Sequence, residues 1–299
     1  MNKIINSDAL DALRKLPDSC CRTCITSPPY YGLRDYGTAG QIGLEDTPDQ
    51  YIENLVKIFR EVRRVLKDDG TLWVNIGDSY TQKNLNGIPW LLAFALRSDG
   101  WYLRSDIIWQ KPNAMPESVK DRPTRAHEYI FLLSKSPRYY YDAEAVKEPA
   151  VGFYNAAPAG SAGTGKPNAR RRGNSRTFRG GGAYTHDRAQ NNSATVERES
   201  HGLAPNESGK RNRRSVWTIA TRPYKGAHFA TFPEELARPC VLAGSRPGDT
   251  VLDPFAGSGT TGAVAAQEGR DFIGIEINPD YCEIIRQRLD ACCQKGAKP

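Results

Sequence analysis

The sequence predicts an α/β fold, because short apolar strands alternate with amphipathic helices before residue 150 and again after residue 215. The connections between these segments are short, as βα units require. Between them lies a long stretch, 150–215, in which the alternation is lost. We therefore expect residues 1–149 and 216–299 to be two halves of one domain, with 150–215 as an insert.

The half before the insert has the clearer helix signals. The stretch 49–66 carries apolar residues from Tyr51 to Leu66 at helical spacing, and Gly70 is a natural stop after it. A second helix is expected at 88–97. Strands are expected at 22–26, 71–76, 102–109 and 128–133.

The half after the insert resumes at Val216 and again alternates. A helix is expected from Pro233 to Ala243, closed by Gly244. The segments that follow are a strand at 250–253, a helix at 260–267, a strand at 271–276 and a helix at 279–289.

The insert contains the positive charge of the chain. Lys166 to Arg214 holds 12 Lys and Arg against 4 Asp and Glu, whereas the rest of the chain holds 29 against 30. Such a block suits a polyanion through phosphate contacts, although a solvated basic loop has the same composition. With few large apolar residues the insert cannot form its own core, so we expect it to be partly flexible.

The chain has no apolar run long enough to span a bilayer and begins without an apolar signal region, so we expect a cytoplasmic protein without membrane contact. Seven cysteines are present, and Cys21 and Cys24 have the CxxC spacing of zinc or redox sites. No second ligand pair completes a zinc site, and the pair lies in an expected strand. We therefore expect reduced, structural cysteines and no metal.

The strongest chemical motif is the loop from Asp253 to Gly262, between an apolar strand and a helix. Its glycines let the backbone approach a ligand closely, and the helix N-terminus offers unpaired N–H groups. Glu276 ends the next strand, where an acidic side chain can accept hydrogen bonds from ribose hydroxyls. The loop has no GK[ST] and is therefore not a phosphate-binding P-loop. A plain βα turn is the simpler alternative.

The second motif is Thr26-Ser27-Pro28-Pro29-Tyr30 at the end of an early strand. The prolines fix the backbone and donate no hydrogen bonds. Carbonyl oxygens and the Ser27 hydroxyl are left to accept from an amino group, and the Tyr30 ring can stack on a planar base. Accepting from an amine steers its lone pair toward an electrophilic methyl group. Alone, the motif could equally be a surface turn or a proline-rich ligand.

Taken together and in this order, the motifs resemble those of the β-class DNA amino-methyltransferases, the N4-cytosine and N6-adenine family. In that family a (D/N/S)PPY motif comes first, a target-recognition insert follows, and an FxGxG cofactor motif lies near the C-terminus. This chain has Ser27 to Tyr30, the basic insert, and Phe255 to Gly259 in that order. The resemblance implies a Rossmann-like, circularly permuted fold that uses S-adenosylmethionine to methylate double-stranded DNA.

The resemblance also implies roles for individual residues. Ser27, Pro28, Pro29 and Tyr30 would be catalytic. The cofactor would be bound by Asp8, Thr26, His228, Phe232, Asp253, Pro254, Phe255, Gly257, Ser258, Gly259, Thr260 and Glu276. Asp8 would hold the adenine amine, or simply cap a helix. Ile108 to Pro112 would lie near the pocket of the flipped base, with Trp109 alternatively a core residue. DNA would be contacted by Arg170, Arg171, Arg172, Arg176, Arg179, Lys210, Arg211, Arg213 and Arg214.

The expected reaction is methyl transfer to the exocyclic amine of a flipped-out base. In the family, Ser at the first motif position is typical of N4-cytosine enzymes, but a hydroxyl can accept from either amine, so both bases stay open. Alternatives are an RNA or protein-amide methyltransferase, in which the motif order is usually reversed, and a DNA-binding module without catalysis. The resemblance also suggests a homodimer and a cognate restriction endonuclease as partners.

Overall fold

The computed structural model describes residues 2–35, 37–38, 40–150, 209–222 and 232–296, with side chains up to Cys292. The chain divides into two compact units, Met1–Lys147 with Asn212–Pro299, and Glu148–Arg211. In the smaller unit, strand β8 (Glu148–Pro149) pairs antiparallel with β9 (Lys210–Arg211). The predicted insert, 150–215, lies outside the described residues over most of its length, and the predicted domain division stays a prediction.

An eight-stranded sheet forms the centre of the larger unit, in the order β1-β12-β11-β2-β3-β7-β6-β10. Its strands are β1 (Asn2–Asn6), β2 (Cys21–Thr26), β3 (Leu66–Ile76), β6 (Tyr102–Gln110), β7 (His127–Ser134), β10 (Val216–Thr218), β11 (Thr250–Asp253) and β12 (Asp271–Glu276). Among these described strands, only β7 runs antiparallel to its neighbours. The carboxyl ends of the parallel strands therefore meet at one edge, where ligands bind in open α/β sheets.

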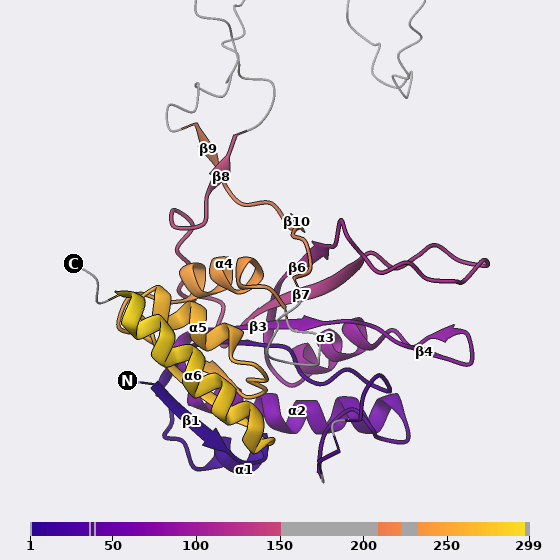
Figure 1. The fold of residues 1–299 in the computed structure, drawn as a ribbon, viewed down its shortest axis with the longest axis horizontal. Helices are drawn as coiled ribbons and strands as arrows, with labels where there is room; N and C mark the ends of the chain where they lie inside the picture. The colour runs from indigo at the N-terminus through magenta and orange to yellow at the C-terminus, as the bar shows by residue number, and fades with distance from the viewer. Residues whose placement is uncertain (1, 36, 39, 151–208, 223–231, 297–299) are drawn as a thin grey trace, which may run out of the picture. The chain divides into compact units, whose positions relative to one another are not determined.

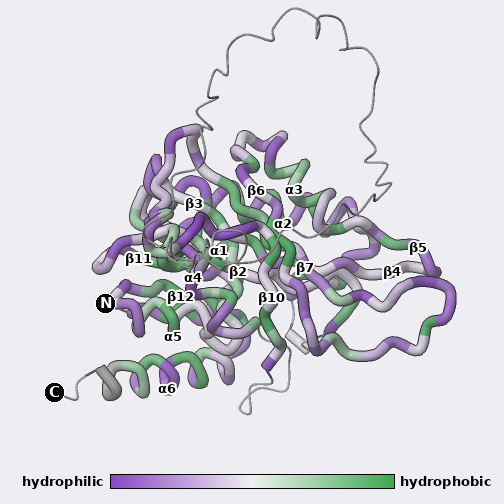
Figure 2. Tube along the Cα trace, turned by 90° about the horizontal axis from the view of Figure 1, so that it is seen from above, coloured by the Kyte–Doolittle hydropathy of each residue, from purple (hydrophilic) through white to green (hydrophobic). Residues whose placement is uncertain are grey.

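Helices cover both faces of this sheet, which makes the unit three layers thick (Figure 1). One core contains α1 (Ala9–Arg14), α2 (Pro48–Val65) and α3 (Ile88–Ser98). The other contains α4 (Glu234–Gly244), α5 (Thr260–Gln267) and α6 (Pro279–Gly296). Hydrophobic and hydrophilic residues alternate along α6, as expected of a helix with one packed face (Figure 2).

The α2 helix shows why these segments fold locally as they do. The Thr47 hydroxyl accepts a hydrogen bond from the backbone N–H of Gln50 at 3.3 Å, and Pro48 follows in the first turn. The predicted apolar stripe is buried from Tyr51 to Val65. The helix ends at Val65, however, and the predicted stop at Gly70 lies inside β3, where the pairing of β2 with β3 shifts register.

Most of the predicted elements are confirmed within a residue or two, including β11, α5 and β12 at their predicted bounds. The edge strand β1 and the short hairpin β4 (Tyr80–Thr81) and β5 (Asn84–Leu85) were not predicted. Cys21 and Cys24 are free, fully buried thiols in β2, which confirms their expected structural packing. Within the described residues, no helix has the length and apolarity needed to cross a bilayer.

Candidate active site

One cleft of about 790 Å³ lies at the carboxyl ends of the strands in the larger unit. It contains residues from both predicted motifs, which are more than 200 residues apart in the sequence. The predicted site residues that line it are Asp8, Ser27, Pro28, Pro29, Tyr30, Phe232, Pro254, Phe255, Gly257, Ser258, Thr260 and Glu276. The fold therefore brings the two motifs to one cavity, as their chemistry requires.

The glycine-rich loop forms one end of the cleft. Gly257 has a φ of +52°, and an added Cβ would have only the Phe255 carbonyl oxygen within 4 Å, so a side chain there would enter open space. Gly259 has a φ of +79° and precedes α5. Its added Cβ would lie 3.0 Å from the Ile285 side chain, so this glycine is needed for packing rather than for ligand approach.

Glu276 fixes the shape of this loop. Its Oε2 accepts from the Gly257 N–H at 2.8 Å and its Oε1 from the Asn278 N–H at 2.9 Å. Burial raises the pKa of the Glu276 carboxyl above its usual value. The side chain thus holds the loop and also lines the cleft, where ligand hydroxyls could reach it.

Asp253 and Thr26 lie behind the cleft surface and do not line it. Their side chains join β11 to β2 through a 2.6 Å hydrogen bond from the Thr26 hydroxyl to Asp253 Oδ1, which also accepts from the Phe255 N–H at 3.1 Å. Asp253 is 1% exposed, and its burial raises the pKa of the carboxyl to about 7. Both residues, like Gly259, shape the wall, and their predicted contact with a cofactor stays a prediction.

Asp8 serves as the helix cap that the sequence offered as an alternative. Its Oδ1 accepts from the backbone N–H groups of Leu10 at 2.9 Å and Asp11 at 3.1 Å, at the start of α1. The same residue lines the cleft. Capping and ligand binding are therefore compatible at this position.

The Ser27 to Tyr30 segment forms the other end of the cleft and is held from behind. The Tyr51 hydroxyl of α2 donates to the Pro29 carbonyl oxygen at 2.7 Å. The Tyr30 ring packs on Gly77, where an added Cβ would lie 2.7 Å from Tyr30 Cε2. Packing on both sides therefore fixes the backbone that carries Ser27.

A partly buried polar cluster joins the Tyr30 hydroxyl to Asn75, Glu128 and Lys111. Only Lys111 belongs to a segment that the sequence predicts near the site. Tyr30 donates to Glu128 Oε2 at 2.6 Å, and Asn75 Nδ2 donates to both, at 2.9 Å to the Tyr30 hydroxyl and 3.1 Å to Glu128. Lys111 Nζ forms an ion pair with Glu128 Oε1. Burial and the Glu128 charge raise the pKa of Tyr30 well above its usual value.

The sequence did contain a signal for this cluster. Asn75 is a polar residue in the buried run of β3, and Glu128 lies two residues before the buried run of β7, which begins at Ile130. Lys111 belongs to the segment that was expected near the base pocket. Trp109 is 3% exposed and also lines the cleft, with Lys111 Nζ 4.3 Å from its ring centre. Trp109 is thus both a packed core residue and part of the cleft wall, and its place near a base pocket stays a prediction.

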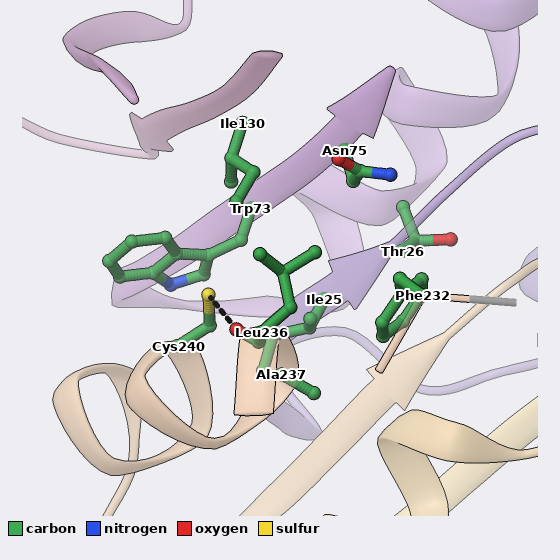
Figure 3. A pocket seen from close by; sticks show the side chains of 9 residues that line it. All are labelled: Ile25, Thr26, Trp73, Asn75, Ile130, Phe232, Leu236, Ala237 and Cys240. Atoms are coloured by element: carbon green, nitrogen blue, oxygen red, sulfur yellow. Dashed lines mark hydrogen bonds between the residues drawn. The ribbon is translucent and has the colours of Figure 1, made fainter. Parts of the chain in front are cut away.

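A second, much smaller cavity of about 10 Å³ lies behind the motif and is lined mainly by apolar side chains (Figure 3). Phe232 reaches both cavities, whereas Thr26 lines only the small one. Asn75 lies at its edge, with Leu236 and Cys240 of α4 on the opposite side (Figure 3).

The predicted DNA contacts are described only in part. His228, Arg170, Arg171, Arg172, Arg176 and Arg179 lie outside the described residues. Lys210 and Arg211 form β9, in which Arg211 Nε donates to Glu148 Oε1 at 2.9 Å. Arg213 and Arg214 precede β10 in the larger unit, where the Arg213 guanidinium lies 4.5 Å from the Trp217 ring centre. Their contact with DNA stays a prediction.

Comparison with known proteins agrees with this geometry. The family model for DNA methylases of the N6/N4 type matches residues 21–287. Type II methyltransferase M.Cfr9I of Citrobacter freundii is 47% identical over 96% of this chain and 87% of its own length. Type II methyltransferase M.SmaI of Serratia marcescens is 46% identical over 96% of this chain and 90% of its own.

Solved structures show the same fold. PvuII DNA methyltransferase (cytosine-N4-specific) is similar with a TM-score of 0.66 and 19% identity, over 98% of this chain and 91% of its own. A putative DNA modification methylase from Thermus thermophilus, complexed with S-adenosyl-L-methionine, has a TM-score of 0.60 and 24% identity, over 98% and 96% of the two chains. By its fold, its motifs and its relatives, the chain belongs to the N6/N4 family of DNA methylases.

Proposed function

We propose that this chain transfers a methyl group to the exocyclic amine of a base flipped out of duplex DNA, and that the amine is N4 of cytosine. The observation that carries the proposal is the single cleft that joins the Ser27 to Tyr30 segment to the glycine-rich loop. A methyl donor bound at one end and an amine held at the other share one cavity. Proximity and orientation then supply much of the rate enhancement.

The glycine-rich end of the cleft fits S-adenosyl-L-methionine, the methyl donor of this family. Asp8 and Glu276 bring carboxylate oxygens that can accept from amine and hydroxyl hydrogens, and Phe255 brings an aromatic ring. Gly257 leaves open the space that a Cβ would fill. When bound, S-adenosyl-L-methionine supplies an electrophilic methyl group on a sulfonium.

The opposite end of the cleft orients the target amine. The Ser27 hydroxyl and the Pro28 carbonyl oxygen accept hydrogen bonds from the amine, because the proline nitrogens offer no competing donor. Tyr30 and Trp109 bring aromatic rings to the same wall. Stacking against such rings is how a flipped base is held in related chemistry. Flipping is required because the amine inside a duplex is out of reach.

One feature favours cytosine over adenine. It is Ser27, which at this motif position resembles the N4-cytosine members of the family. Lys111 does not discriminate between the bases, because its ammonium can donate to the carbonyl oxygen of cytosine or to a ring nitrogen of adenine.

Basic residues beyond the cleft would contact the phosphates. Lys210, Arg211, Arg213 and Arg214 are the predicted contacts that the structure describes. Their contribution would be largely independent of DNA sequence and sensitive to salt. The predicted homodimer, restriction endonuclease partner and cytoplasmic location stay predictions beside this proposal.

The test is transfer of a labelled methyl group to DNA from a methylase-deficient host, followed by digestion to nucleosides. We expect label in N4-methylcytosine, and its loss in Ser27→Ala with cofactor binding intact. Ser98→Ala, an exposed serine at the end of α3, is the matched control. Label in N6-methyladenine would overturn the choice of base. Transfer only to RNA or protein, or full activity of Ser27→Ala, would overturn the proposed function.

A further inference from the structure

The hydroxyl protons of Ser27 and Tyr30 point one after the other toward Glu128, and amine methylation releases a proton beside Ser27. We propose that Ser27, Tyr30 and Glu128 form a proton path, which carries the proton released by the target amine to the Glu128 carboxylate. The inference rests on the proposed function, because it concerns the amine held by Ser27. It adds a destination for the proton that methylation must release.

The hydrogen-bond chemistry of the end groups fixes the direction of the path. An ionised carboxylate only accepts, so the 2.6 Å contact has Tyr30 donating to Glu128 Oε2. An amide nitrogen only donates, so the two hydrogens of Asn75 Nδ2 are shared among the Tyr30 hydroxyl at 2.9 Å, Glu128 Oε2 at 3.1 Å and Ser27 Oγ at 3.4 Å. The Ser27 hydroxyl hydrogen is then directed to the Tyr30 oxygen, 3.4 Å away. Both hydroxyl protons along this path therefore point toward Glu128.

The orientation of Asn75 is itself determined by its surroundings. Its Oδ1 is buried and has no hydrogen-bond partner among the described residues, while its Nδ2 meets three acceptors. Asn75 lies at the edge of the small apolar cavity, across from Leu236 of α4 (Figure 3). Reversing the amide would place Oδ1 against the Glu128 carboxylate, and two acceptors repel. The donor side of Asn75 therefore faces the path.

Lys111 gives the two carboxylate oxygens of Glu128 different partners. It pairs with Oε1, whereas Tyr30 and Asn75 donate to Oε2, so Oε2 is the oxygen at the end of the path. The side chains of Lys111 and Glu128 are only 19% and 14% exposed. Both side chains line the cleft, so a base that fills the cleft would separate them from bulk water and favour an internal proton acceptor.

The step balances in atoms and charge. The amine nitrogen forms a bond to the methyl carbon as the carbon–sulfur bond of the sulfonium breaks, and the nitrogen gains the positive charge. Its proton passes to Ser27 Oγ, the Ser27 hydroxyl proton to the Tyr30 oxygen, and the Tyr30 proton to Glu128 Oε2. The products are a neutral methylated amine, a neutral thioether and a neutral carboxylic acid. The raised pKa of Tyr30 fits this role, because the phenol gives up one proton only as it takes another.

The experiment compares Glu128→Gln and Tyr30→Phe with the wild type in single-turnover methylation of DNA that the wild type modifies. Gln preserves size and can still accept a hydrogen bond from Tyr30, but it cannot take a proton. Phe preserves the ring and removes the relaying oxygen. The matched controls are Glu61→Gln and Tyr139→Phe. In the wild type, Glu61 pairs with Arg64 on α2, and Tyr139 accepts a hydrogen bond from Arg104. Binding of DNA and of the methyl donor is measured separately for each variant.

We expect each path variant to lose about 100-fold or more in the rate of transfer, the usual contribution of a proton-transfer group. The dissociation constants for DNA and for the methyl donor should stay close to those of the wild type. The wild-type reaction should be slower in D₂O than in H₂O, and this difference should be absent in the variants. The double variant should be no slower than either single one, because the two groups act in series. The control variants should match the wild type.

Two results would overturn the path. One is a Glu128→Gln rate close to wild type, since a purely structural role for this carboxylate survives the substitution. The other is a slow Glu128→Gln with a normal Tyr30→Phe, which would exclude Tyr30 as the relay. Either result leaves the wild type methylating DNA, so the proposed function would stand. Absence of methyl transfer by the wild type would instead remove the proposed function.

Discussion

The carboxyl group of Asp253 is buried in the wall between β11 and β2, and this burial makes the stability of the protein depend on pH. Burial raises the pKa of its carboxyl from 3.8 to about 7, although Thr26 and the Phe255 N–H donate to it. The folded protein therefore holds this proton at pH values where the unfolded chain has released it. The contribution to stability is present below pH 4 and falls as the pH rises through 7.

The size of the effect follows from these two pKa values. Linkage gives a loss of about 2.5 kcal/mol between pH 5 and pH 8, and about 4 kcal/mol over the whole transition. Asp253→Asn removes the titration while keeping an oxygen that can accept from Thr26. The free energy of unfolding of this variant, minus that of the wild type, should therefore rise by about 2.5 kcal/mol from pH 5 to pH 8.

The assay is urea denaturation of both proteins without methyl donor, at several pH values in this range. Titrations of other groups largely cancel in the difference, because both proteins contain them. A difference that is flat between pH 5 and pH 8 would refute the raised pKa. The same flat difference is expected if hydrogen bonds outweigh burial at this carboxyl, because the folded and the unfolded chain are then both ionised above pH 5.

Three further predictions concern the cleft and the DNA contacts. Gly77→Ala would place a Cβ 2.7 Å from the Tyr30 ring, so we expect the transfer rate to fall while calorimetry shows unchanged binding of the methyl donor. Glu276→Gln should weaken methyl-donor binding by about tenfold in the same calorimetric assay, since each charged hydrogen bond contributes about 1.5 kcal/mol or more; equal affinity would exclude Glu276 from the site. Replacing four basic residues by Gln should reduce the slope of log affinity against log salt by up to about 4 units, and an unchanged slope would exclude them from the DNA surface. These residues are Lys210, Arg211, Arg213 and Arg214.

The parts of the fold that local patterns determine could be predicted from the sequence. The apolar stripe of α2 and the strand, loop and helix around Asp253 need only nearby residues to be recognised. Gly70 shows the limit of such patterns. It was interpreted as a helix stop, but it lies in β3, where an added Cβ would be 2.8 Å from the Lys67 oxygen and 2.9 Å from the Arg22 oxygen. Glycine is favoured both at helix ends and where two strands approach closely, so its presence alone does not tell the two apart.

The sequence marks the members of the polar cluster singly, but their contacts could not be predicted from it. Asn75 and Glu128 are 53 residues apart, and their contact depends on the antiparallel pairing of β3 with β7. The register of that pairing, in which Ile76 faces Tyr129, is set by packing on both faces of the sheet. Each residue alone is only a polar position in a buried strand, and sequence motifs mark neither.

The pairing of β1 with β12 determines when, during synthesis of the chain, the cleft can be completed. Asn6 donates two 2.9 Å hydrogen bonds, to the carbonyl oxygens of Glu276 and Ile277, across a separation of about 270 residues. At ribosomal speeds of about 5 to 20 residues per second, the first strand waits roughly 15 to 50 s for its partner. Asp8 and Glu276, from opposite ends of the chain, meet only then. A nascent chain on the ribosome therefore lacks part of the cleft wall until β12 has emerged.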